Sequence, residues 1–439
     1  MIVKPMPISG FRENLPEFQL IEDNYKEIIK KNYSLSGFTP IDTPVVERLD
    51  VLLAKGADDN EVYAISRVNG EEGDDSDLGL RFDLTVPLAR FVSQYEGELT
   101  FPFRRQHISR VYRGERPQKG RFREFYQADI DIIGNGSLPL FADVEVLSTI
   151  YNSLKELDFG QFVININNKK FLSGFLESIG VTNIKETISI IDKKDKVRHE
   201  KLKEMFLSIG LSEQTIEKIV EFIKFGEEKT STEILTYYSQ FDSLLLKTGL
   251  DELKYLYTSL ISLGVDEQYI KINPSISRGL NYYTGTVFET FITGALNMGS
   301  ISSGGRYEDL ASNFTKNNFP GVGGSIGLTR LLSVLESIGK IETNKKTTSK
   351  VMLVNMGDDF LKKNLEIIRF LRQNLINTEL YLDSEAKIVK QLKYANNKKI
   401  NYVIIIGETE IQNDIVVLKN LYSGEQFEIK QENLLDYIF

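Results

Sequence analysis

Residues 103–134, FRRQHISRVYRGERPQKGRFREFYQADIDIIG, hold the densest set of side chains that can do chemistry. Between Arg104 and Arg123 the chain carries seven arginines and one lysine against a single acid, Glu115. The local charge is +7 in a protein whose net charge is −9. A local positive cluster on an otherwise acidic chain is more typical of a binding site for a small anion than of an extended surface that binds polyanions. We therefore interpret this segment as an Arg-rich loop that binds something small and negative.

A strand is predicted directly after this loop. In FREFYQADIDIIG the polar residues Glu124, Gln127, Asp129 and Asp131 alternate with apolar neighbours, which is the period of two typical of a strand. Such a strand carries amide and carboxylate groups on one face. A nucleotide phosphate together with an amine is the ligand pair that fits a loop and strand of this kind.

Four residues of this segment, Arg113, Glu115, Gly120 and Phe125, could position the phosphates, the amino group and the flat face of a purine nucleotide. Arginine suits the task because its planar guanidinium presents a fork of donors. Two alternatives stay open for the loop taken alone. One is a solvated basic hairpin, and the other is a generic nucleic-acid patch.

The tripeptide Asp83-Leu84-Thr85 is predicted at the junction between a strand and a helix. Thr85 could simply cap that helix, and Asp83 could favour its positive end. Beside Gln127 and Asp131, however, the tripeptide suggests a second role. Two carboxylates and an amide could hold an α-ammonium group and a ring N–H.

Two later segments combine glycine with aromatic or basic residues. RGLNYYTGTVFE, residues 278–289, places Arg278 near Tyr282 and Tyr283. Successive side chains of a strand point to opposite faces, so at most one tyrosine would face a shared pocket directly. The alternative is an aromatic strand in a core. SSGGRYEDL, residues 302–310, has two glycines where the backbone passes close to another group, or where it makes a tight turn.

The segment GVGGSIGLTRLL, residues 321–332, places Gly327 and Arg330 within or next to an apolar helix. A buried arginine needs an anionic partner, either a protein carboxylate or a triphosphate. Neither a GxxxxGK[ST] loop nor a strand-linked GxGxxG occurs in the chain, so P-loop and dinucleotide folds lack support.

The composition excludes several kinds of catalytic site. The 439 residues include no cysteine, which excludes disulfides, thiolate nucleophiles and Cys-ligated metals. Only His107 and His199 occur, so neither a His-based zinc site nor a Ser-His-Asp triad is expected, and we predict no metal held by the protein alone. The chain shows no charged-then-apolar leader and no apolar run near 18 residues, so we expect a cytoplasmic protein.

The elements that must position these residues begin with a mixture of helices and strands. A helix is predicted over Pro16–Asn32, short strands over Phe38–Asp42 and Leu78–Phe82, and a helix over Val86–Tyr95 with Thr85 as its N-cap.

The middle of the chain, Lys169–Leu250, is predicted to form short amphipathic helices, which indicates a helical insertion. Strands are predicted over Tyr282–Thr293 and Met298–Ser303, and a helix with a Gly-rich approach over residues 321–337. The polar segment 338–349 is interpreted as a linker.

The last block of the chain, residues 350–439, alternates strand and helix, which predicts an α/β domain with partly parallel strands. The predicted strands are Val351–Asn355, Glu379–Leu382 and Asn401–Ile406, and the predicted helices are Asp359–Asn374 and Glu385–Asn396.

These segments together resemble the histidyl-tRNA synthetase family of the class II aminoacyl-tRNA synthetases, over essentially the whole chain. GFTPIDTPVVERLDVL resembles class motif 1, a dimer-forming element. RGERPQKGRFREFYQADIDIIG resembles motif 2, and GVGGSIGLTRLL resembles motif 3. RFDLTVPLARF and RGLNYYTGTVFE are typical of the histidine enzyme. Asn281 stands where the family usually has Asp, and we expect a changed supporting hydrogen bond rather than lost activity, because the amide keeps an acceptor oxygen.

The resemblance also implies roles for individual residues. Arg278 would act at the α-phosphate, and Arg113 would act with it in catalysis. ATP would be bound by Arg113, Glu115, Phe125 and Arg330. Histidine would be bound by Asp83, Leu84, Thr85, Gln127, Asp131, Tyr282 and Tyr283.

The fold implied by the resemblance is α+β. It has a class II antiparallel-sheet catalytic core over residues 1–168 and 252–337, a helical insertion over 169–251 and a linker over 338–349. Residues 350–439 would form the anticodon-binding α/β domain. The implied reaction activates L-histidine with ATP and transfers it to the 3′ end of tRNA(His), with Mg²⁺ bound mainly through the phosphates. The implied assembly is a homodimer, without membrane or DNA as partner.

Two rival functions were weighed against this expectation. The first is the regulatory subunit of ATP phosphoribosyltransferase, a non-catalytic relative that binds histidine in the same core. The α/β block at 350–439 and the joint presence of Arg113, Arg278 and Arg330 argue against it. The second is a nucleic-acid-binding protein that uses the basic loop alone, which leaves the Asp83-Leu84-Thr85 tripeptide without a role.

Overall fold

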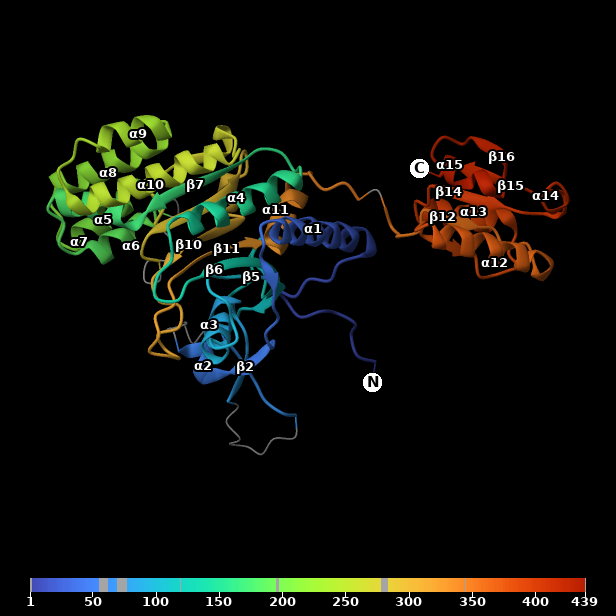
Figure 1. Ribbon diagram of the computed structural model, residues 1–439, viewed down its shortest axis with the longest axis horizontal. Coiled ribbons are helices and arrows are strands. Elements are labelled where there is room, and N and C mark those ends of the chain that lie inside the picture. The colour runs from blue at the N-terminus through green and yellow to red at the C-terminus, as the bar shows by residue number, and fades with distance from the viewer. Residues whose placement is uncertain are drawn as a thin grey trace. The chain divides into compact units, whose positions relative to one another are not determined.

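The structure is a computed structural model, which describes residues 2–54, 62–68, 77–118, 120–194, 197–277, 283–343 and 345–438 (Figure 1). The chain forms two compact units. The larger comprises Met1–Arg12 and Tyr25–Ile341, and the smaller comprises Glu13–Asn24 and Glu342–Phe439. Within the described residues, no helix combines the length and the apolar character that crossing a membrane requires.

An eight-stranded sheet in the order β1-β5-β6-β11-β10-β9-β7-β8 forms the centre of the larger unit. Its neighbours are antiparallel except at the edges, where β1 runs parallel to β5 and β7 parallel to β8. The predicted α+β class with an antiparallel-rich core is therefore confirmed. The strands are Thr39–Pro40 (β1), Phe103–Tyr112 (β5), Glu124–Ile133 (β6), Phe162–Asn168 (β7), Ile270–Ile272 (β8), Thr286–Ile292 (β9), Ser302–Tyr307 (β10) and Gly321–Gly327 (β11).

The two faces of this sheet differ in polarity, because side chains alternate along each strand. In β6, Ala128, Ile130 and Ile132 are buried on the apolar face. Helices α4 (Phe141–Glu156) and α11 (Leu328–Ser337) pack against β6, and Tyr33 of α1 (Pro16–Leu35) donates a hydrogen bond to the Ala128 carbonyl at 2.9 Å. The opposite face of β6 carries Gln127, Asp129 and Asp131 and remains available for a site.

A second, three-stranded antiparallel sheet in the order β2-β4-β3 precedes the long strands. The buried residues of helix α3, Leu88, Ala89 and Val92, pack in one cluster with Ile133 of β6. This packing brings the start of α3 to the polar face of the large sheet. The elements are β2 (Val46–Arg48), α2 (Leu49–Leu53), β3 (Tyr63–Ile65), β4 (Leu78–Leu80) and α3 (Thr85–Gln94).

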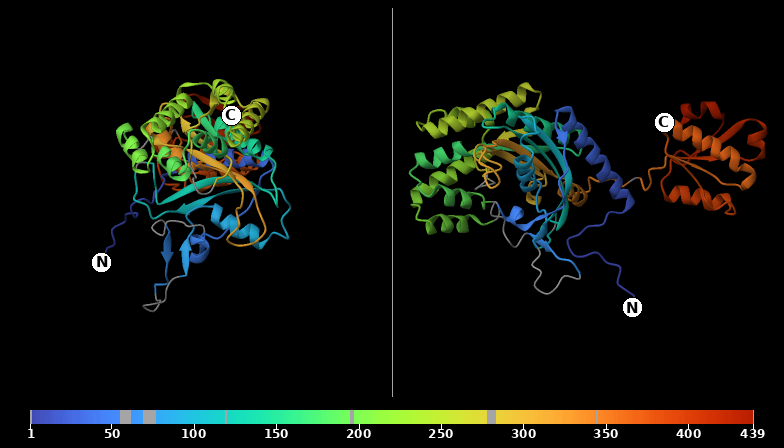
Figure 2. Two further views of the ribbon diagram at one scale, coloured as in Figure 1. Left: turned by 90° about the vertical axis from the view of Figure 1, so that its left-hand side faces the viewer. Right: turned by 60° about the horizontal axis from the view of Figure 1, so that its bottom comes forward.

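Six helices follow β7 and gather at one end of the larger unit (Figures 1 and 2). Helices α5 and α10 pack closely because each has a glycine at the contact. A β-carbon on Gly174 would lie 2.3 Å from the Leu246 nitrogen, and one on Gly249 would lie 2.2 Å from the Phe171 nitrogen. The predicted run of short helices is therefore found. The helices are α5 (Lys169–Ser178), α6 (Ile184–Ile191), α7 (His199–Ser208), α8 (Glu213–Glu228), α9 (Ser231–Tyr238) and α10 (Leu244–Ser262).

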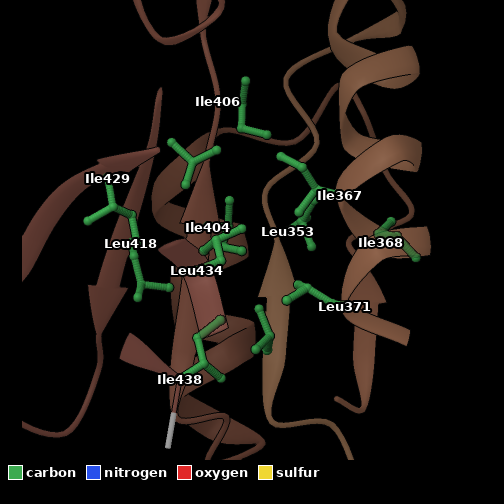
Figure 3. Close-up of a cluster of buried hydrophobic side chains, with 12 residues drawn as sticks. Leu353, Ile367, Ile368, Leu371, Ile404, Ile406, Leu418, Ile429, Leu434 and Ile438 are labelled. Carbon is green, nitrogen blue, oxygen red and sulfur yellow. The ribbon is translucent and has the colours of Figure 1, made fainter. Parts of the chain in front are cut away.

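The C-terminal unit has a five-stranded sheet in the order β13-β12-β14-β15-β16. The first three strands are parallel and the last two are antiparallel, as predicted for the part up to Ile406. Figure 3 shows Leu353 and Ile404 of the sheet beside Ile367 and Leu371 of α12, in the apolar core of this unit. The elements are β12 (Val351–Leu353), α12 (Asp358–Gln373), β13 (Thr378–Leu380), α13 (Ile388–Asn397), β14 (Tyr402–Ile405), α14 (Glu408–Gln412), β15 (Ile415–Asn420), β16 (Gln426–Lys430) and α15 (Leu434–Tyr437).

Several predictions of local structure were wrong. Thr85 is not the N-cap of α3, because Asp83 Oδ1 accepts the hydrogen bond from the Val86 nitrogen at 3.0 Å. The predicted strand Met298–Ser303 is a short 3₁₀ helix over Leu296–Met298, followed by β10 from Ser302. The predicted strand from Tyr282 begins only at Thr286.

The Gly-rich approach to α11 is itself a strand, β11, which pairs with β6 on one side and β10 on the other. Glycines present no side-chain alternation, so its sequence carries no strand pattern. The predicted Arg-rich loop is also partly a strand, since Arg104, Arg105 and Arg110 belong to β5 and the loop begins only after Tyr112.

Candidate active site

The polar face of the large sheet brings together residues from five segments of the chain. In β6, Gln127, Asp129 and Asp131 lie side by side on this face. Across the sheet, Asp129 pairs with Ser325 of β11, and Asp131 pairs with Arg105 of β5. The predicted alternation of β6 therefore places an amide and two carboxylates in one row.

Asp131 is held by two partners on this face. Arg105 Nη2 lies 2.7 Å from Asp131 Oδ2, and Tyr307 donates a hydrogen bond to Asp131 Oδ1 at 3.0 Å. Asp129 Oδ2 lies 3.8 Å from the same Arg105 nitrogen. All three charged side chains are buried, so one guanidinium sits against two carboxylates away from water.

Burial dominates the electrostatics of this pair of carboxylates. It raises the pKa of Asp129 to about 7 and that of Asp131 to about 6, while the charge of Arg105 opposes both shifts. The Asp131 charge adds to the rise at Asp129. A cationic ligand would favour the ionised carboxylates, so this row of side chains suits an ammonium group.

The Asp83-Leu84-Thr85 tripeptide reaches the same face. Arg105 Nη2 donates to the Leu84 carbonyl at 3.4 Å, so one side chain contacts both the tripeptide and Asp131. Burial raises the pKa of Asp83, and its hydrogen bond from the Val86 nitrogen opposes the rise. Thr85 is the first residue of α3.

Tyr283 lies close to the carboxylates. Burial, together with the charge of Asp131, raises the pKa of Tyr283. Its ring lies against Gly305 of β10, where a β-carbon would come within 2.9 Å of Tyr283 Cδ1. The expected close backbone approach at the glycine pair is therefore found. Two other predicted site residues, Arg278 and Tyr282, lie outside the described residues.

A cavity of about 230 Å³ opens next to this row. Arg113 lies over the Phe125 ring at 5.2 Å and donates from Nε to the Phe82 carbonyl at 3.0 Å, so its guanidinium is fixed at the wall. Arg330 of α11, which also lines the cavity, donates to the Met298 carbonyl at 2.8 Å. The cavity is lined by Arg113, Glu115, Gly120, Arg121, Phe122, Phe125, Gln127, Ser300, Ile301, Ser302, Ser303, Ser325, Gly327 and Arg330.

Five of the predicted site residues thus share one cavity. Arg113, Glu115, Phe125 and Arg330, predicted for ATP, line it together with Gln127, predicted for histidine. Asp83, Leu84, Thr85, Asp131 and Tyr283 do not line this cavity. Asp83, Leu84, Asp131 and Tyr283 lie around Arg105 and the carboxylates, and Thr85 follows Leu84 as the first residue of α3.

Most of the positive cluster does not face the cavity. Arg104 pairs with Glu145 at 2.7 Å and Arg110 with Glu124 at 3.5 Å, whereas Arg121, which lines the cavity, pairs with Glu115 at 3.2 Å. The compensating acids that the segment itself lacks are therefore partly supplied by other parts of the chain. Of the seven arginines between Arg104 and Arg123, Arg113 and Arg121 line the cavity.

Sequence reasoning missed Arg105 and Tyr307 as residues of the site. The stretch 103–112 shows no alternation because both of its faces are polar. Gln106, for example, points away from the carboxylates and donates to the Phe38 carbonyl at 2.7 Å. The register of the β5–β6 hairpin, which pairs residue 105 with residue 131, was the signal that could have found Arg105.

Within the described residues, no group of three or more His, Cys, Asp or Glu side chains is arranged to hold a metal ion. The cavity does offer the Glu115 carboxylate and the hydroxyls of Ser300, Ser302 and Ser303. Oxygen donors of this kind suit Mg²⁺ that arrives on phosphates.

Comparisons with known proteins agree with this geometry. Residues 10–331 match the family model described as histidyl-tRNA synthetase, and residues 350–438 match the anticodon binding domain. The chain is 44% identical to the histidine–tRNA ligase of Clostridium tetani, with 100% of this chain and 98% of that protein covered. It is 41% identical to that of Finegoldia magna, with 97% of each covered.

Solved structures give the same picture. The crystal structure of histidyl-tRNA synthetase from Nostoc sp. PCC 7120 matches with a TM-score of 0.92 at 37% identity, over 100% of this chain and 99% of that one. A chain from Bacillus halodurans, described as an ATP phosphoribosyltransferase regulatory subunit/histidyl-tRNA synthetase, matches with a TM-score of 0.75 at 22% identity, which is a likeness of fold.

Proposed function

Because the chain belongs to the histidyl-tRNA synthetase family, we propose that it activates L-histidine with ATP and transfers the histidyl group to the 3′ end of tRNA(His). The observation that carries the proposal is the row of Gln127, Asp129 and Asp131 leading into a cavity walled by Arg113 and Arg330. The regulatory-subunit alternative is not favoured, since full-length relatives at 44% and 41% identity are histidine–tRNA ligases.

Histidine is assigned to the carboxylate end of the site. Its α-ammonium group and its ring N–H would meet Asp83, Gln127 and Asp131, because buried carboxylates gain most from a cationic or hydrogen-bond-donating partner. The resemblance assigns the same end to Leu84, Thr85, Tyr282 and Tyr283. The position of Tyr283 beside Asp131 supports the last of these assignments.

ATP is assigned to the cavity. The Phe125 ring would stack on the adenine, and Arg113 and Arg330, which both line the cavity, would neutralise phosphate charge. Glu115 would accept from the adenine amino group, as its resemblance to the family implies. Mg²⁺ would be carried on the phosphates, with few protein ligands.

The first chemical step is in-line attack of the histidine carboxylate on the α-phosphorus, which releases pyrophosphate. The protein's task is to position the two substrates and to neutralise charge on the α-phosphate oxygens. Arg113 is fixed for this task by its bond to the Phe82 carbonyl, and the resemblance assigns the same task to Arg278. In the second step a terminal hydroxyl of the tRNA attacks the acyl carbon and AMP leaves.

The C-terminal unit would bind the anticodon, and motif 1 would form a homodimer in the cytoplasm. The match of residues 350–438 to the anticodon binding domain supports the first assignment. Sedimentation at micromolar concentration tests the second, and a monomer mass would contradict it.

Charging of tRNA tests the proposal as a whole. The protein is incubated with ATP, Mg²⁺, labelled histidine and a transcript of tRNA(His). We expect acid-precipitable label that depends on ATP and is absent with a tRNA for another amino acid. A protein that binds histidine but charges no tRNA would instead support the regulatory alternative.

A further inference from the structure

Among the described arginines of the larger unit, Arg81 and Arg105 are completely buried, and they differ in what they contact. Arg105 contacts groups of the amino-acid pocket: the Asp131 carboxylate at 2.7 Å, the Asp129 carboxylate at 3.8 Å and the Leu84 carbonyl at 3.4 Å. Its Nε and Nη1 have no hydrogen-bond partner among the residues that the structure describes.

Arg81 is held almost entirely by backbone and hydroxyl groups. It donates to the carbonyl of Thr43 at 2.6 Å, to the carbonyl of Arg110 at 3.0 Å and to the hydroxyl of Ser109. The nearest carboxylate is that of the exposed Asp42, at 4.0 Å. Arg81 therefore has the environment of a residue that stabilises the fold, and it serves as a natural comparison.

A buried guanidinium that only stabilised the fold would be expected to satisfy its donors, because an unpaired buried donor is unfavourable. Among the described residues, Arg105 Nε and Nη1 lack a hydrogen-bond partner, and so do Asp129 Oδ1 and Gln127 Oε1 on the same face of the sheet. Unsatisfied atoms of several side chains on one polar face indicate a place that a polar ligand completes.

We propose that Arg105 is a positioning residue of the amino-acid pocket. It fixes Asp131 and Asp129 of β6 relative to the Asp83-Leu84-Thr85 tripeptide, so that both sides of the pocket meet the ammonium group and the ring N–H of histidine together. The charge of Arg105 also favours the ionised form of these carboxylates, against the effect of burial. This inference rests on the proposed function, since it assigns a role within the same site.

The protonation of Asp129 and Asp131 depends on the charged groups around them as well as on Arg105. Removing Arg105 takes away the cation that opposes protonation of Asp129 and Asp131, so both carboxylates would hold a proton to higher pH. The pKa of His107 on β5 is lowered to about 4, chiefly by burial, so His107 is neutral throughout the range of interest. The titratable and charged groups that interact electrostatically with Arg105, Asp129 and Asp131, or with the groups beside them, are Tyr33, Arg81, Asp83, His107, Arg113, Tyr283, Glu289 and Tyr307.

The test compares Arg105→Gln with wild type in histidine-dependent ATP–pyrophosphate exchange between pH 5.5 and 9. We expect the KM for histidine to rise about 10- to 100-fold with little change in the KM for ATP. The acid limb of kcat/KM for histidine should move to higher pH by about one unit or more. Free histidine itself titrates in this pH range, but it does so equally in the assays of all variants. The difference between the pH profiles of wild type and variant therefore reports on the protein. A folded Arg105→Gln protein with a wild-type KM and acid limb would overturn the proposal.

Arg105→Lys and Arg81→Lys separate positioning from folding. Arg105→Lys keeps the charge, but its ammonium group ends one atom short of Nη2, the nitrogen through which Arg105 contacts Asp131, Asp129 and Leu84. It should therefore raise the KM for histidine and leave the acid limb near that of wild type. If Arg105→Gln does not fold, Arg105→Lys becomes the test, and an unchanged KM for histidine in that variant would overturn the proposal.

The control variant is Arg81→Lys. It should lower the melting temperature without a selective change in the KM for histidine. Absence of exchange in the wild type would instead defeat the proposed function itself.

Discussion

Asp131 of β6 and Gly323 of β11 lie directly opposite each other, and the Asp131 carboxylate occupies the space that a side chain on Gly323 would need. A β-carbon built on Gly323 would lie 1.9 Å from Asp131 Oδ1, which no real contact allows. The glycine is therefore required by the position of the carboxylate, not by an unusual backbone angle.

Gly323→Ala should accordingly displace Asp131 and weaken histidine binding. We expect a loss of about 1–3 kcal/mol in histidine affinity, since an ammonium group would lose its buried partner. The KM for ATP should change little. Gly97→Ala is the control, because a β-carbon there meets nothing within 4 Å. An alanine at position 323 that leaves the KM for histidine unchanged would mean that Asp131 does not contact the substrate.

The row of Gln127, Asp129 and Asp131 could be predicted because one strand contains all three residues and the period of two is local. Arg105 could not be found in the same way, since its role depends on the pairing of β5 with β6 across a long connection. The strand character of residues 321–327 was missed for a related reason. Glycines are required there by the side chains of neighbouring strands, such as Asp131, Phe288 and Tyr307, and not by the local sequence.

Asp129→Asn should change how stability depends on pH. The pKa of Asp129 is about 7 in the folded protein, against an ordinary value of 3.8. Between these two values the folded state binds the extra proton, so this residue makes the free energy of unfolding fall as pH rises from about 4 to about 7. The asparagine variant lacks that contribution. It should lose less stability than wild type between pH 5 and pH 8, measured by urea unfolding of the larger unit. Parallel curves for the two proteins would contradict the assigned protonation.

Arg278→Ala should reduce turnover more than affinity. Negative charge grows on the α-phosphate oxygens in the transition state, and a fixed guanidinium stabilises that state more than the bound substrates. Loss of one such donor commonly lowers the rate about 10²–10³-fold. Arg278→Lys should restore little, since a point charge cannot reproduce the two-pronged geometry. Pre-steady-state adenylate formation measures the effect, with the melting temperature as the control. A folded Arg278→Ala protein with the wild-type adenylation rate would refute the catalytic assignment.

Removal of residues 345–439 should separate the two steps of the reaction. The proposed groups for histidine and ATP all precede Leu332, and the C-terminal unit has its own apolar core. A soluble truncated protein should therefore still form histidyl-adenylate but charge tRNA poorly. Both activities are compared with those of the full chain at equal active-site concentration. Equal loss of exchange and charging would show that the two functions are not separable at this boundary.

The most direct test of the account is ATP–pyrophosphate exchange by the full-length wild-type protein, measured with each of the twenty amino acids in turn. We expect exchange that requires Mg²⁺ and is stimulated by histidine well above every other amino acid. The reason is that the carboxylates of β6 would bind histidine beside the cavity that binds ATP, so that the two substrates react to form histidyl-adenylate. Exchange that histidine does not stimulate, in a folded protein that binds ATP, would contradict it.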